Sequence, residues 1–160
     1  RIAARGKRIG AGLVNTYPYH SKSMFDILNK AKVLDPDLIV LDSINDCTGI
    51  ESQGTNASLV DKMSMLKDYC DATGCTAIVI AHVNGDGETA GPVSFEHMSD
   101  INITIKVCDN GDRVIRGNKN RFAPDGRYGA YRLVGDGICW LPDDESDALT
   151  ESKKTRKVKA

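Results

Sequence analysis

An acidic side chain follows directly on an apolar run near the start of the chain. The run is Leu38-Ile39-Val40-Leu41, and Asp42 and Ser43 come next. Nucleotide-hydrolysing α/β proteins use a buried strand in this way, to place a carboxylate beside a phosphate-bound magnesium ion. The same pattern is also that of a core strand that simply ends in a capping acid. Asp42 is therefore a candidate residue of a magnesium site, and Ser43 is a candidate site residue or a strand-end cap.

Two cations lie far downstream, in the stretch Lys119-Asn120-Arg121-Phe122. Lys119 and Arg121 are two residues apart, so on an extended segment they project to the same side. Paired cations stabilise negative charge on a transferring phosphoryl group, and they also bind the DNA backbone. The third interpretation is a solvated loop.

A histidine and a glycine-rich stretch follow a second apolar run, Thr76 to Ala81. His82 at the end of such a strand could sense a γ-phosphate and relay its loss to the next loop, although a lone histidine is more often structural. Residues 84–93 contain three glycines, which predict a mobile loop suited to nucleotide-gated contact with DNA. Asn84, Gly85 and Gly87 are the candidate DNA-binding residues of this loop.

Alternating helices and strands must position these residues. Apolar residues at helical spacing predict a helix from Ser23 to Leu34, ahead of the strand Leu38 to Asp42. A second helix is expected from about Asn56 to Ala72, with Gly74 as its stop, and the strand Thr76 to Ala81 follows. Two aliphatic strands joined by a helical crossover predict neighbouring parallel strands covered on both faces.

The pattern changes beyond Asp100 to alternating strands. The predicted strands are 101–108 and 113–117, joined through Asn110-Gly111, and 128–134 and 138–141, which flank a glycine-rich turn. The predicted fold class is therefore α/β, with a parallel core extended by antiparallel hairpins.

Four motifs in one order resemble those of the bacterial RadA (also called Sms) ATPases, which are RecA-like DNA repair and recombination proteins. The resemblance runs from about Arg5 to about Leu141. The motifs are His82-Val83-Asn84-Gly85-Asp86-Gly87, Ala90-Gly91-Pro92, Phe95-Glu96-His97-Met98-Ser99-Asp100 and Lys119-Asn120-Arg121-Phe122. The resemblance implies a RecA-like core that binds ATP and Mg²⁺, and a homo-oligomeric ring or filament, hexameric in the complete protein, that acts on single-stranded or branched DNA.

The resemblance also implies residue roles. Asp42 matches the Walker B acid that holds magnesium through water, with Ser43 tuning that water and His82 close by. Lys119 and Arg121 would act in trans, reaching a neighbouring subunit's γ-phosphate as an arginine finger does. The sequence departs from the family pattern at two positions: Gly85 stands where the family has lysine, and Ala123 stands where it has glycine. Phe122 is expected to anchor the turn by packing.

The sequence contains no phosphate-binding loop of the Gly-x-x-x-x-Gly-Lys-Ser/Thr type. In RadA-like proteins this loop, the first strand and a catalytic glutamate lie just upstream of a basic helix, which residues 1–8 resemble. The expectation is an N-terminally incomplete ATPase that is inactive alone, whose complete parent is a DNA-dependent ATPase. A degenerate paralogue is the other explanation.

Length and composition bound the remaining expectations. With 160 residues, 41% of them hydrophobic, the chain fits one domain. We expect a partial ATPase core over 1–142, followed by a charged, disordered tail over 143–160. The five cysteines lack the close pairing of a zinc site, which indicates a reducing, cytoplasmic setting. No apolar run approaches the roughly 20 residues that span a bilayer, so no membrane partner is expected.

Two other classes stay open. One is a relative of DnaB-type replicative helicases, against which the Lys-Asn-Arg-Phe and Glu-His-Met stretches count. The other is a noncatalytic RecA-like module that binds DNA or a protein partner without turnover.

Overall fold

The computed structural model describes residues 2–12, 14–48, 59–82, 97–126 and 128–154, and the chain divides into two compact units. Unit 1 comprises residues 1–17 and 100–160, and unit 2 comprises Pro18–Ser99. The single ATPase core expected over 1–142 stays a prediction. Each unit has its own sheet, and the two sheets share no hydrogen-bonded strand within the described ranges.

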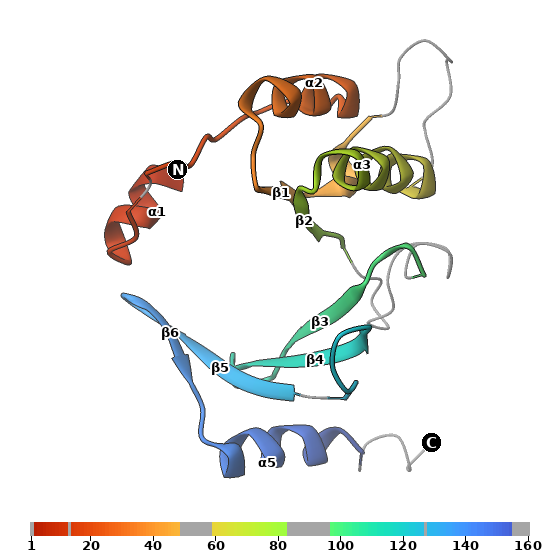
Figure 1. The fold of residues 1–160 in the computed structure, drawn as a ribbon. Coiled ribbons are helices and arrows are strands. Elements are labelled where there is room, and N and C mark those ends of the chain that lie inside the picture. The colour runs from red at the N-terminus through yellow and green to blue at the C-terminus, as the bar shows by residue number, and fades with distance from the viewer. Residues whose placement is uncertain (1, 13, 49–58, 83–96, 127, 155–160) are drawn as a thin grey trace. The chain divides into compact units, whose positions relative to one another are not determined.

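Unit 2 is an α/β unit with a two-stranded parallel sheet (Figure 1). Strands β1 and β2 pair from Leu38 with Thr76 to Asp42 with Ile80. The elements of this unit are α2 (Met24–Leu34), β1 (Leu38–Asp42), the 3-10 turn η1 (Ile44–Asp46), α3 (Leu59–Thr73) and β2 (Thr76–Ile80). The predicted helix–strand order and the parallel pairing are confirmed.

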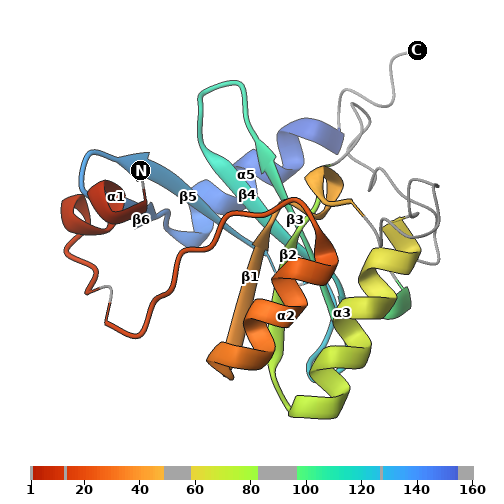
Figure 2. The ribbon, with the colours of Figure 1, turned by 90° about the horizontal axis from the view of Figure 1, so that it is seen from above.

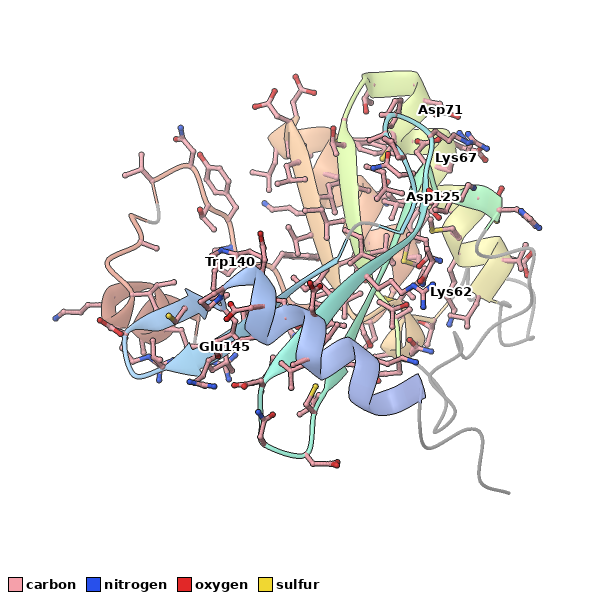
Figure 3. All side chains as sticks on the ribbon, turned by 90° about the horizontal axis from the view of Figure 1, so that it is seen from below. Lys62, Lys67, Asp71, Asp125, Trp140 and Glu145 are labelled. Carbon is pink, nitrogen blue, oxygen red and sulfur yellow. The ribbon has the colours of Figure 1, made fainter. Side chains whose placement is uncertain are left out.

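Local signals in the sequence set the ends of the two helices. Ser23 caps α2, because its side chain accepts a hydrogen bond from the amide of Asp26 at 3.3 Å. Gly74 follows α3 with a φ of 76°, a left-handed conformation that glycine adopts without steric cost, and its amide donates to the Cys70 carbonyl at 2.8 Å. Lys67 and Asp71 form an ion pair at 2.7 Å on the exposed side of α3 (Figure 3). Solvent exposure limits what this pair contributes to stability.

Helices α2 and α3 lie side by side over the same face of β1 and β2 (Figure 2). Their inner residues form one core with the strands, centred on Met24, Ile44 and Leu66, each at most 1% exposed. The apolar residues on the other face of the strands are exposed; they are Leu38, Val40, Ile78 and Ile80. The sequence predicted cover on both faces of this sheet. Among the described residues of this unit, helices cover one face.

Unit 1 contains a four-stranded antiparallel sheet in the order β3-β4-β5-β6. Its elements are α1 (Ile2–Arg8), β3 (Ile101–Val107), β4 (Arg113–Asn120), β5 (Tyr128–Val134), β6 (Gly137–Trp140) and α5 (Asp143–Lys154). The predicted hairpins are therefore confirmed, and β4 extends three residues further than expected. As a result Lys119 and Asn120 belong to a strand rather than to a loop.

Helix α5 corrects the prediction of a disordered tail from residue 143. Three acids in its first turn favour helix formation, because negative charge is stabilised at a helix amino terminus. Ser146 is 3% exposed, and its hydroxyl accepts a hydrogen bond at 3.1 Å from the amide of Ala130 in β5. The helix therefore packs on the sheet (Figure 1). Residues 155–160 lie outside the described residues.

A buried acid joins the β3–β4 turn to β5. Asp112 is 2% exposed and accepts two hydrogen bonds from Arg132, at 2.7 and 2.8 Å. Asn110 donates a third at 2.8 Å. The hydrogen bonds and positive charge of Arg132 hold the pKa of Asp112 below its usual value, against the opposing effect of burial. This arrangement fixes the hairpin against the neighbouring strand.

Candidate nucleotide site and interface cations

Strand β1 carries Asp42 to its carboxyl end, where the side chain is exposed. The peptide bond from Asp42 to Ser43 is cis. The chain then enters η1, whose first residue, Ile44, is completely buried in the core of unit 2. Because Ile44 is fixed in the core, the residues on either side of it, Ser43 and Asn45, are held at the same edge of the sheet.

Ser43 lies between an acid and a histidine. Its hydroxyl donates a hydrogen bond to Oδ2 of Asp46 at 2.9 Å and lies 3.3 Å from Nε2 of His82. A hydroxyl has one proton, which is given to Asp46 here, so the contact with His82 requires that Nε2 carries a proton and donates it. The geometry therefore favours the imidazole tautomer protonated at Nε2.

Asn45 holds the main chain of the same histidine. Its side-chain oxygen accepts a hydrogen bond from the backbone amide of His82 at 2.8 Å. Two hydrogen bonds thus connect Ser43 and Asn45, before and within η1, to His82, the second residue after β2 and 37 to 39 positions later in the sequence. The sequence reasoning missed Asn45 and Asp46. The available signal was an amide and an acid side chain two and three residues after the strand-end serine.

A cysteine directly follows η1. Cys47 is buried, and its thiol donates to the Ser43 carbonyl at 3.5 Å. Burial raises the pKa of the Cys47 thiol, and the ammonium group of Lys62 partly offsets this rise. Lys62 lies on α3 (Figure 3). It is 8% exposed, so most of its aliphatic stem is covered. Cys47 is therefore a neutral packing residue beneath the site.

The donors at this edge fit a magnesium ion held partly by water. Asp42 offers an exposed carboxylate, whereas Ser43 is 4% exposed and its hydroxyl already donates to Asp46. Mg²⁺ prefers oxygen ligands and keeps several waters. Within the described ranges no group of three or more His, Cys, Asp or Glu side chains is arranged to hold a metal ion. The residues thus suit a site in which the protein supplies one acid and the phosphates and water supply the other ligands.

The predicted cations lie in unit 1. Lys119 is half-buried in β4, opposite Asn102 of β3. Arg121 follows the strand, where its guanidinium pairs with Asp100 at 2.8 Å and its amide donates to the Asp100 carbonyl at 3.1 Å. Both side chains of the pair are more than half exposed, so the ion pair orients Arg121 without fixing it strongly.

The structure describes some of the remaining predicted site residues and leaves others outside the described ranges. Asn84, Gly85 and Gly87 lie outside the described residues. Phe122 is 78% exposed, so the expected packing anchor is wrong; the turn is instead held by a hydrogen bond from the Phe122 amide to the Asn120 side chain at 2.9 Å. Asp42, Ser43 and His82 come together at one edge of unit 2. Lys119 and Arg121 belong to the other unit.

Comparisons with known proteins give several relatives. DNA repair protein RadA of Mycobacterium tuberculosis is 28% identical over 149 residues, which are 89% of this chain and 31% of the relative. RadA of Haemophilus influenzae is 30% identical over 142 residues, 86% of this chain and 31% of the relative. RadA of Aquifex aeolicus is 25% identical over 155 residues, 94% of this chain and 35% of the relative. The chain thus spans about a third of the length of the curated relatives it matches.

Among solved structures, the RadB recombinase matches with a TM-score of 0.51 and 16% identity, over 72% of this chain and 57% of that one. No family model matches the chain. None of the described helices combines the length and the apolar character that crossing a membrane requires. The fold is that of a RecA-like protein. Within that class, the chain belongs to the RadA-type family.

Proposed function

We propose that this chain is part of a DNA repair or recombination ATPase of the RadA type, in which ATP hydrolysis between subunits is coupled to DNA binding or branch migration. The observation that carries the proposal is the meeting of Asp42, Ser43 and His82 at the carboxyl edge of two parallel strands. Ligands of open α/β sheets bind outside the carboxyl ends of the strands. The RadA relatives support this class over a replicative helicase.

Each residue has a defined task in this proposal. Asp42 would hold Mg²⁺ through water, with Ser43 tuning that water, and the metal would supply charge neutralisation at the β- and γ-phosphates. His82 offers a proton donor at the same edge. Arg121, together with Lys119, would present positive charge to the nucleotide of a neighbouring subunit, and Asp100 orients that arginine before the neighbour arrives.

The test is ATP turnover by the full-length protein that the gene encodes, with Mg²⁺ and with or without single-stranded DNA. DNA is expected to stimulate turnover. Asp42→Asn is expected to lower it by about 10²-fold or more, since a charged group that stabilises the transition state is lost.

Asp37→Asn is the matched control. Asp37 is an exposed acid at the opposite, amino end of β1, so its variant is expected to retain parental turnover. Equal turnover of Asp42→Asn and the parent would contradict the assigned magnesium site. DNA binding by a parent that never hydrolyses ATP would favour a noncatalytic module.

A further inference from the structure

The hydrogen bonds around His82 have a direction, and Asp46 determines it. An ionised carboxylate only accepts hydrogen bonds, so the Ser43 proton must point to Asp46. The oxygen of Ser43 then presents a lone pair to Nε2 of His82 at 3.3 Å. Without Asp46, the Ser43 hydroxyl could turn and donate to an unprotonated Nε2 instead. The acid thus selects which imidazole nitrogen carries the proton, although it does not itself contact the ring in the described hydrogen bonds.

Asn45 supplies the second constraint. It accepts the backbone amide of His82 at 2.8 Å, at the point where the chain leaves β2. Ile44, between Ser43 and Asn45, is completely buried, so the whole turn is anchored in the core of unit 2. The main chain of His82 is therefore held by η1, and its ring by Ser43 directly before η1.

We infer that Asn45 and Asp46 are positioning residues for His82: Asp46, through Ser43, keeps Nε2 as the proton donor, and Asn45 fixes the main chain from which the ring projects. This inference deepens the proposed function. A phosphate oxygen at the edge that Asp42 shares would compete with Ser43 for the Nε2 proton. When that phosphate binds or leaves, the Nε2 proton of His82 would change its acceptor between the phosphate oxygen and Ser43. Asn45 would transmit this change to the chain that follows β2.

The tautomer is measured directly by ¹⁵N NMR of the histidine-labelled chain in mildly alkaline buffer, where an ordinary imidazole is neutral. The chain has three histidines, so the His82 signals are identified by their absence in His82→Gln. The parent is expected to show His82 protonated at Nε2. Protonation at Nδ1 in the parent would overturn the inference without the use of any further variant.

Two substitutions at Asp46 separate positioning from a structural role. Asp46→Ala is expected to give a mixture of both tautomers, because the Ser43 hydroxyl is released. Asp46→Asn retains an acceptor oxygen and is expected to restore the Nε2 form. Asp68→Ala, at an exposed acid of α3, is the matched control and should leave the His82 signals unchanged. An unaltered Nε2 tautomer in Asp46→Ala would overturn the role of Asp46.

The role of Asn45 is tested through amide hydrogen exchange of His82. Asn45→Leu is expected to speed this exchange by about fivefold, which corresponds to one net hydrogen bond of about 1 kcal/mol, and Asn45→Asp, which keeps an acceptor, should restore protection. Unchanged exchange in Asn45→Leu would overturn the role of Asn45.

The link to function is tested in the full-length protein with an ATP analogue that is not hydrolysed. The ratio of DNA affinities with and without the analogue is expected to fall by about fivefold in Asn45→Leu and to recover in Asn45→Asp. An unchanged ratio would overturn the transmission through Asn45. If the parent shows no effect of the analogue, the proposed function fails, whereas the NMR and exchange results still decide whether Asn45 and Asp46 position His82.

Discussion

Removal of the Ile44 side chain tests how the core positions the candidate site. Ile44 is 0% exposed, between Ser43 and Asn45. Ile44→Ala deletes three buried carbon groups, which at about 0.8 kcal/mol each is about 2.5 kcal/mol of transfer free energy. The cavity left in a core that cannot fully collapse raises the expected loss of stability to about 3–4 kcal/mol.

The assay is urea unfolding followed by far-UV circular dichroism. With a slope of about 2 kcal/mol per molar urea, the expected loss moves the midpoint down by about 1.5–2 M. Ile78→Ala is the matched control, because Ile78 is 51% exposed on the uncovered face of β2 and should cost only about 1 kcal/mol. A loss in Ile44→Ala no larger than that in Ile78→Ala would refute the claim that this residue anchors η1.

Three further predictions concern stability. Asp112→Asn should lower stability near neutral pH by weakening the contact with Arg132. Because the pKa of Asp112 is lowered in the folded state, the difference in stability from the parent is expected above about pH 4 and should vanish as the pH falls through that lowered pKa. Thermal unfolding measured across this pH range checks it. Gly74→Ala should cost about 1 kcal/mol or more in urea unfolding, because its φ is 76°, whereas Gly12→Ala, at a position without positive φ, should be close to neutral. Ser23→Ala should cost about 1 kcal/mol through loss of the α2 cap, and equal midpoints for parent and variant would show that the cap contributes nothing.

The sequence was sufficient for elements whose signals are local. The aliphatic runs before Asp42 and His82 gave both parallel strands, and the glycine at position 74 gave the end of α3, because burial and backbone conformation act over a few residues. Helix α5 was missed because its sequence is mostly charged and polar and offers few apolar residues. A hydrogen bond from the amide of Ala130 to the Ser146 hydroxyl helps to hold it on the sheet, and such a contact has no periodic signature.

The candidate site was predicted in part for the same reason. Asp42, Ser43 and His82 stand at strand ends, where pattern and topology together place them at one edge. Asn45 and Asp46 depend on hydrogen bonds across a separation of 37 residues or within a single short turn, and these follow from three-dimensional geometry alone. The residue type likewise did not predict the exposure of Phe122, since an aromatic ring is more often buried.

The most direct test of the central claim is a mixing experiment with two inactive variants of the full-length protein. If Asp42 serves the nucleotide of its own subunit and Arg121 serves the neighbour's, Asp42→Asn and Arg121→Ala should each abolish DNA-stimulated ATP turnover. In an equal mixture, half of the subunits keep the acid and half of their neighbours keep the arginine, so about a quarter of the interfaces and of the parental turnover should return. No recovery in mixed oligomers would contradict a site shared between subunits.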